Sequence, residues 1–136
     1  MDLLVLTHDA PGSPGTRKLF ALVGEYCADA SLRSDLGTPI SSAPGDAWLI
    51  ARDGEAVAGF CVVSSQKNGR AKLHALHAPT AAIAGTLRRA AIKQAKAGGA
   101  KEIAYTAAPS EAAALRKDGW ARGQERGQYI TFTKEL

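Results

Sequence analysis

The chain has few cysteines, which cross-link small proteins, and few aromatic residues, which fill their cores. It has two cysteines among 136 residues, Cys27 and Cys61, and aromatic residues make up only 6% of it. Both cysteines lie in apolar runs, which favours buried free thiols in a reducing cytoplasm, although a disulfide is also compatible with the sequence. The shortage of aromatics predicts a core built from alanine, leucine, valine and isoleucine.

Long apolar runs and metal-ligand spacings are absent as well. No run approaches the roughly 20 apolar residues that a membrane helix needs. Residues 1–6 are apolar apart from Asp2, but no basic segment precedes them and polar residues follow at once, so no signal peptide is indicated. The three histidines and two cysteines show no zinc-ligand spacing, and no Walker-type loop occurs. We therefore expect one cytoplasmic domain over residues 1–136, with no metal and no membrane contact.

Charge is distributed unevenly along the chain. The net charge is +4, and residues 73–136 carry ten basic and five acidic side chains. This basic half could attract the phosphate of a cofactor or a nucleic acid, or it could be a solvated helix face. The candidate basic residues are Arg88, Arg89, Lys93, Lys96, Arg116, Lys117, Arg122 and Arg126. Only Trp120 and Tyr129 lie near them in sequence to stack on bases, so nucleic acid is the less favoured partner.

The first part of the chain predicts a strand and then a helix. Apolar residues 3–6 indicate the strand, and the proline- and glycine-rich residues 9–15 indicate a turn. Thr16 can cap a helix, because apolar residues recur with helical spacing from there to Cys27. Residues 37–45, with two prolines, indicate a loop.

The middle of the chain predicts an antiparallel meander of three strands. Two of them, residues 47–52 and 55–65, flank the tight turn Asp53-Gly54. A second turn with Asn-Gly at its centre leads into the third strand, residues 71–78.

The last part of the chain returns to helical periodicity. Ile83, Leu87, Ala91 and Ala95 repeat every four residues, which predicts a basic amphipathic helix that ends at Gly98-Gly99. A strand, a short helix and two more strands follow, at residues 102–106, 111–117, 120–122 and 128–133. The order is β-α-β-β-β-α-β-α-β-β, which predicts an α/β (α+β) fold with a mixed sheet, since the long helix suits a crossover between parallel strands.

Three segments of this pattern resemble motifs of the GNAT (general N-acetyltransferase) superfamily. Val57-Ala-Gly-Phe60 resembles a strand that follows the family's hairpin, and Leu73 to Pro79 resembles its fourth strand. Leu115-Arg-Lys-Asp-Gly-Trp120 resembles the segment that closes its last helix. The order of the strands and helices is also similar to that of the GNAT fold, so the resemblance covers most of the chain, and its specific part runs from Ala47 to Thr133.

The resemblance implies that acetyl-CoA binds where the fourth and fifth strands part. The pyrophosphate would lie on backbone amides at the start of the next helix, where unpaired N–H groups attract anions. Here that segment is Thr80–Thr86, which leads into Arg88 and Arg89. The implied cofactor-binding residues are Leu76, His77, Ala78, Ala82, Ile83, Ala84, Gly85 and Thr86.

Three positions depart from the family's pattern. Ala82 and Ile83 stand near its usual Gln/Arg and first glycine, and only Gly85 fits the last glycine. Residues 107–109 lack the asparagine that often follows the fifth strand. Leu115 stands where the family has the tyrosine that protonates the departing thiolate, and leucine has no proton to donate.

His74 is the candidate general base, since imidazole titrates near neutrality. In a straight strand, residues three apart face opposite sides, so we expect only one of His74 and His77 to face the site. The expected register puts His77 on the other face of the sheet, together with Leu73 and Ala75. The alternative interpretation of His74 and of His77 is an ordinary histidine of the sheet without a catalytic role. Glu55 could also face substrate, or be a solvated edge carboxylate.

Tyr105 could replace the missing acid, or be a partly buried aromatic of the sheet. The resemblance implies an N-acetyltransferase that moves an acetyl group from acetyl-CoA to a small-molecule or peptide amine. A backbone amide near Leu76–Ala78 would stabilise the oxyanion. The alternative is a catalytically inactive GNAT-fold binding or regulatory protein that acts on a protein or nucleic-acid partner, because fold does not determine function.

Overall fold

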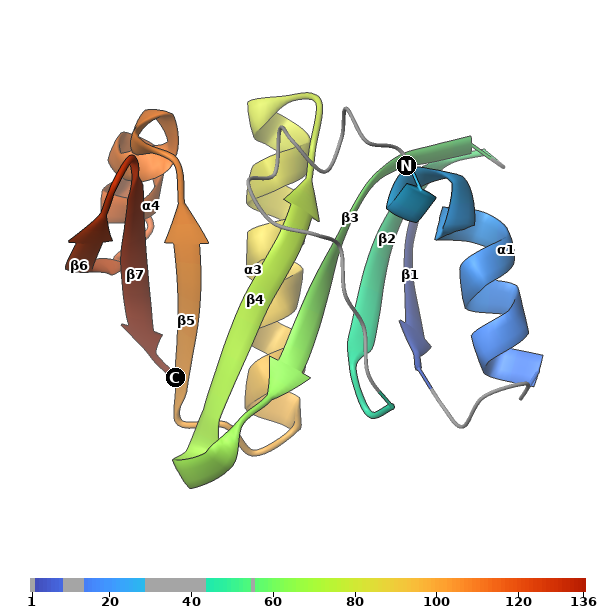
Figure 1. Cartoon of the computed structure of the whole chain (residues 1–136), viewed down its shortest axis with the longest axis horizontal. Coiled ribbons are helices and arrows are strands. Elements are labelled where there is room, and N and C mark those ends of the chain that lie inside the picture. Colours follow the sequence, from blue (N-terminus) through green and yellow to red (C-terminus); the bar gives the residue numbers. More distant parts are fainter. Residues whose placement is uncertain (1, 9–13, 29–43, 55) are drawn as a thin grey trace.

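The computed structural model describes residues 2–8, 14–28, 44–54 and 56–136. They contain one seven-stranded mixed sheet with the order β1-β2-β3-β4-β5-β7-β6 (Figure 1). The strands are β1 (Asp2–Thr7), β2 (Ala47–Asp53), β3 (Ala56–Ser65), β4 (Arg70–His77), β5 (Glu102–Ala107), β6 (Ala121–Arg126) and β7 (Tyr129–Glu135). The predicted fold class and order of elements are confirmed.

The meander forms as its turns predict. Gly54 has φ 63° between β2 and β3, and β3 joins β4 through a turn in which Asn68 has φ 65°. Both values lie in the left-handed region, which glycine and asparagine adopt most readily. The pattern of turn residues was therefore sufficient to predict this hairpin pair.

The helices begin earlier than the sequence predicts. Helix α1 (Pro14–Ala28) starts at Pro14, and Thr16 lies buried inside it, so the cap expected at Thr16 is wrong. Proline suits the first helical position because its fixed φ is already helical and its missing N–H has no partner to lose. Residues 9–13 of the expected turn and 37–43 of the expected loop lie outside the described residues.

Helix α3 (Ala81–Ala97) ends at the glycines expected to bound it, and Thr80, which was expected in a loop, caps its start. The Thr80 hydroxyl accepts a hydrogen bond from the backbone N–H of Ile83 at 3.2 Å, and Gly99 follows the helix with φ 86°. A short 3-10 turn at residues 109–111 leads into α4 (Ala112–Lys117).

The core consists of two apolar clusters, one on each face of the sheet. The first lies between the sheet and the helices α3 and α4, and includes Leu87 and Leu115. The second lies on the α1 face, where Leu19 packs against Trp48 and Phe60. The core is mainly aliphatic as expected, yet its three largest fully buried side chains are Trp48, Phe60 and Phe132.

Strands β4 and β5 are parallel neighbours over only part of their length. Their register runs from Arg70↔Glu102 to Leu73↔Tyr105 and ends there. Beyond Leu73 the two strands diverge, and Figure 1 shows the widening gap with α3 behind it. This divergence leaves β4 without a strand partner on that side at its carboxyl end.

A β-bulge lies in the same half of β4. The pairing with β3 shifts by one residue between Val62↔His74 and Phe60↔His77, and Ala75 has φ 52°. A positive φ is unusual for alanine and costs backbone strain of order 1–3 kcal/mol. Such bulges re-aim side chains and amides beside functional sites.

Candidate functional site

A cavity of about 750 Å³ opens where β4 and β5 diverge. Strand β4 and the residues after it form one wall, β5 and the segment leading into α4 form the opposite wall, and α3 contributes from one face of the sheet. Its lining residues include Lys72, Leu73, His74, Ala75, Leu76, His77, Ala78, Pro79, Thr80, Ala81, Ala84, Arg88, Tyr105, Thr106, Ala108, Glu111, Ala114, Arg126 and Tyr129. Its size lies within the range typical of small-molecule sites.

His74 lines this cavity in a largely dehydrated environment. Its Nε2 lies 2.7 Å from the hydroxyl oxygen of Ser64. Burial lowers the pKa of His74, the charge of Lys72 lowers it further, and Asp46 opposes both. The imidazole is therefore neutral at neutral pH, which is the form that can accept a proton.

The expectation that His74 and His77 face opposite sides of the sheet is wrong. His74 pairs with Val62, and the ring of His77 packs 5.4 Å from that of Phe60, and both partners belong to the α1-side cluster. The bulge at Ala75 inserts an extra residue, which breaks the two-residue alternation that the expectation assumed. Both histidines line the cavity from the same face.

The segment expected to form a phosphate-binding loop is helical from Ala81 onward. The backbone N–H of Ala84 donates to the carbonyl of Thr80, so residues 82–86 form the first turns of α3. The N–H groups at the very start of a helix lack intrahelical acceptors, and Thr80 and Ala81 line the cavity at that point. The start of α3 thus lies beside the cavity, and the N–H groups of Ala81 and Ala82 have no acceptor within the helix.

The expected cofactor-binding residues divide into two groups. Those that line the cavity are Leu76, His77, Ala78 and Ala84. Those that do not are Ala82, Ile83, Gly85 and Thr86. Ala82 and Thr86 are joined by a hydrogen bond within the helix, at 3.0 Å, and Gly85 packs against the side chain of Arg89.

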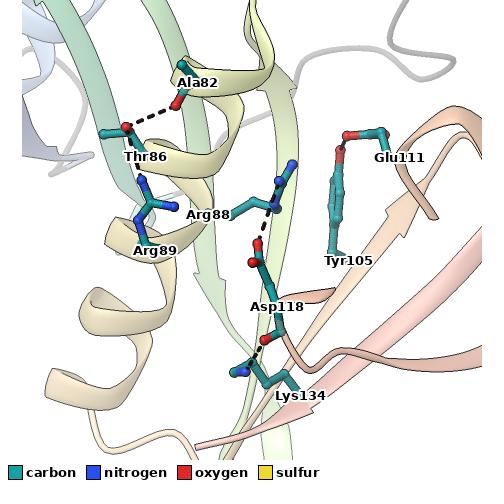
Figure 2. A network of polar contacts seen from close by, with 8 residues as sticks. All are labelled: Ala82, Thr86, Arg88, Arg89, Tyr105, Glu111, Asp118 and Lys134. Carbon is teal, nitrogen blue, oxygen red and sulfur yellow. Dashed lines mark hydrogen bonds and ion pairs between the residues drawn. The ribbon is translucent and has the colours of Figure 1, made fainter. Parts of the chain in front are cut away.

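Tyr105 and Glu111 form a hydrogen-bonded pair on the opposite wall. The phenolic O–H of Tyr105 donates to Oε1 of Glu111 at 2.8 Å (Figure 2). The backbone N–H of Ala108 donates to Oε2 of the same carboxylate at 3.2 Å. Burial raises the pKa of Tyr105, and the neighbouring carboxylate raises it further. The phenol therefore keeps its proton, and that proton is directed at Glu111.

Arg88 is buried near Tyr105, whereas the sequence pattern suggested that it forms part of an exposed basic surface. It is 5% exposed, lines the cavity from α3 and lies close enough to Tyr105 to act on its pKa. Helical spacing could have revealed this, because Arg88 shares the stripe of Ala84, Ala91 and Ala95. The other seven basic candidates are exposed and spread over α3, α4 and β6.

The remaining residues singled out in the sequence are either buried in the core or lie outside the described residues. Leu115 is fully buried in the apolar core between the sheet and its helices, and Cys61 is a buried free thiol whose pKa is raised by burial. Glu55 and the side chain of Cys27 lie outside the described residues.

Within residues 2–8, 14–28, 44–54 and 56–136, no three His, Cys, Asp or Glu side chains converge as metal ligands would. In that same part of the chain, no helix combines the length and the apolar character needed to cross a bilayer.

Comparison with solved structures places this geometry in a known architecture. An acyl-CoA N-acyltransferase from Pseudomonas aeruginosa superposes with a TM-score of 0.76 over 98% of both chains, at 12% identity. The chain has the GNAT fold. ElaA of Escherichia coli matches with a TM-score of 0.70 over 98% of this chain and 99% of its own, at 11% identity.

A third match carries a ligand. The PaiA N-acetyltransferase from Thermoplasma acidophilum, solved in complex with coenzyme A, matches with a TM-score of 0.63 over the full length of both chains, at 15% identity. No protein-family model matches the sequence, and no curated protein sequence does either. The GNAT resemblance seen in the motifs is thus confirmed at the level of the fold.

Proposed function

We propose that the chain is a GNAT-like N-acetyltransferase that moves an acetyl group from acetyl-CoA to an amine. The observation that carries this proposal is the divergence of β4 and β5 beyond Leu73, which opens a cavity of about 750 Å³ beside the start of α3. The free thiol of Cys61 agrees with a cytoplasmic setting.

The residues of the cavity suit a coenzyme A thioester. The opening of α3 offers backbone N–H groups for phosphate oxygens, and no acidic side chain lies in its first turn to repel them. The unpaired edge of β4 beyond Leu73 offers backbone groups along which a pantetheine arm can lie. Acetyl-CoA, when bound, supplies an acyl carbon activated by its sulfur.

His74 is proposed as the base, acting directly or through a water. The acceptor amine loses a proton to the neutral imidazole as its nitrogen bonds to the acyl carbon, and the carbon–sulfur bond breaks. Backbone amides between Leu76 and Ala78, beside the bulge, stabilise the negative charge that develops on the carbonyl oxygen. The chain thus supplies orientation, one proton acceptor and fixed dipoles.

The departing thiolate takes its proton from water in this proposal. Leu115 is buried and apolar, and the O–H of Tyr105 already donates to Glu111. A thiol has a pKa of about 8.5, so a thiolate is a tolerable leaving group near neutral pH. The absence of the family's tyrosine therefore slows the reaction without forbidding it.

The direct test is release of free thiol from acetyl-CoA in the presence of a panel of primary amines, followed by a thiol-reactive dye. We expect amine-dependent release, and a loss of roughly 10²–10⁴-fold in His74→Gln, the usual contribution of a general base. A matched control is His8→Gln, since His8 is also a buried histidine but does not line the cavity.

No release with any amine, although acetyl-CoA binds, would favour the alternative of a catalytically inactive binding or regulatory protein. Release that His74→Gln leaves unchanged would keep the transferase and remove His74 from its mechanism.

A further inference from the structure

A buried guanidinium with unused hydrogen-bond donors lies in the cavity wall. Arg88 is 5% exposed and lines the cavity, and its Nε–H is buried with no acceptor among the described residues. Burying a charged group costs several kcal/mol unless partners replace the lost water. Arginine offers five N–H donors in a planar fork, so such a position calls for a matching acceptor.

The neighbouring carboxylate supplies only part of what Arg88 needs. Among the described residues its ionic partner is Asp118, and Nη2 lies 3.8 Å from Oδ2 (Figure 2). That distance is too long for a hydrogen bond, and the Asp118 side chain is 37% exposed, so solvent screens the pair. The fork of Arg88 is therefore left largely free for another anion.

The charges around the cavity favour a negatively charged ligand. Lys72, Arg88 and Arg126 line it, against one carboxylate, Glu111. That carboxylate already accepts from a phenol and a backbone N–H, so it is committed to the protein. The excess of positive charge remains for a ligand.

The backbone of Arg88 lies about two turns along α3 from the helix start. Seven residues separate it from Ala81, a rise of roughly 10 Å along the axis. Phosphate oxygens at the start of α3 and a second anion at Arg88 can therefore be held together. The second anion lies near Tyr105, next to the point where β4 and β5 separate.

We propose that Arg88 binds a carboxylate of the substrate, so that this enzyme acts on a carboxylate-bearing acyl group or acceptor. The inference rests on the proposed acyl transfer. A guanidinium fork binds a carboxylate through two parallel hydrogen bonds, which a lysine cannot copy. The carboxylate belongs either to the far end of a dicarboxylic acyl group, such as succinyl, or to an amino-acid acceptor.

The test compares ligands that differ only in a carboxylate. Calorimetry would measure the affinity of the protein for succinyl-CoA and acetyl-CoA, and then, with CoA present, for amino acids and their decarboxylated amines. We expect one carboxylate-bearing class to bind more tightly, and Arg88→Met to weaken that class by roughly 10- to 100-fold. Preference for succinyl-CoA assigns the carboxylate to the donor, and preference for amino acids assigns it to the acceptor.

Two variants keep the result interpretable. Arg88→Met has a similar length and fills the same apolar wall, and its melting midpoint reports whether it folds. Arg89→Met is the matched control, because Arg89 is exposed on the same helix and does not line the cavity, so it should leave every affinity unchanged. The proposal would be overturned if succinyl-CoA bound no more tightly than acetyl-CoA and amino acids no more tightly than their decarboxylated amines. It would also be overturned if Arg88→Met kept the preference for the carboxylate-bearing ligand.

Failure of the proposed acyl transfer would look different. Whether no CoA thioester binds, or one binds without any release of thiol, titration with free succinate tests Arg88 alone. Binding of succinate to the unaltered protein and not to Arg88→Met would keep the carboxylate site, and absence of that difference would remove it.

Discussion

At the scale of single residues, the site depends on how burial changes the chemistry of ordinary side chains. His74 and Tyr105 lie on opposite walls of one cavity, and burial favours the neutral form of each. Only the histidine is thereby suited to accept a proton at neutral pH, because the phenol keeps its own for Glu111. A histidine and a tyrosine exposed on the surface would not differ in this way as proton acceptor and proton donor.

The lowered pKa of His74 predicts a particular pH dependence. Since the neutral imidazole is the reactive form, kcat/KM should rise with pH and reach its plateau with a midpoint below 6.5, the ordinary value for histidine. Lys72→Gln removes a positive charge that lowers this pKa, so the midpoint should move upward. The profile is measured by thiol release between pH 5 and pH 8.

The same shift makes a prediction that does not need catalysis. The unfolded chain binds the proton of His74 more readily than the folded chain, so the free energy of unfolding should fall as pH drops below about 6.5. In His74→Gln, the free energy of unfolding measured by denaturation should decrease less over the same pH range. A midpoint above 6.5, or one that Lys72→Gln does not move, would contradict this reading of His74.

At the scale of elements, local sequence patterns predicted far more than long-range ones. The meander followed from turn residues such as Asp53-Gly54, and α3 followed from its four-residue apolar repeat and its glycines, because these signals act over a few neighbours. The bulge at Ala75 has no such signal, since alanine does not favour a positive φ. The wrong face assigned to His77 follows directly from that missing bulge.

The carboxyl end of β4, after the bulge, lies against Gly59 of β3, so a substitution at Gly59 tests this packing. A Cβ atom at Gly59 would lie 2.7 Å from the carbonyl oxygen of His77 and 3.0 Å from Cγ2 of Ile83. Gly59→Ala must therefore push β3 away from β4 or α3. We expect a loss of about 1–3 kcal/mol in the free energy of unfolding, measured in urea, and weaker binding of acetyl-CoA.

Gly24 provides the matched control for that substitution. It lies in α1, and no atom of the described residues comes within 4 Å of an added Cβ, so Gly24→Ala should stabilise the protein by about 0.5–1 kcal/mol. If Gly59→Ala is as stable as the unaltered protein, the close approach of β3 to the carboxyl end of β4 is not as described.

At the scale of the whole molecule, the sheet is almost divided in two, and the packing holds it together. Strands β4 and β5 share four paired positions, whereas one apolar cluster joins residues of both halves, such as Leu49 and Phe132, beneath α3 and α4. The cavity can therefore open between the strands without separating the halves. The divergence itself was expected from the GNAT resemblance, not from any local pattern.

Arg88 shows why the rest of the site escaped prediction. A basic residue on a basic helix is usually solvated, but Arg88 is buried near Asp118 and Tyr105, which are distant from it in sequence. The same holds for Glu111, which pairs with Tyr105 only because a short turn returns the chain beside β5.

The central claim is that the gap between β4 and β5 holds a coenzyme A thioester, and thermal melting tests it most directly. Ala84 lines the cavity, so Ala84→Trp should fill it, whereas Ala97→Trp, at the exposed far end of the same helix, should not. At about 100 times its dissociation constant, acetyl-CoA should stabilise the unaltered protein and Ala97→Trp by roughly 2.7 kcal/mol. Ala84→Trp should show no shift in melting midpoint. No shift in the unaltered protein, or an equal shift in Ala84→Trp, would contradict the claim.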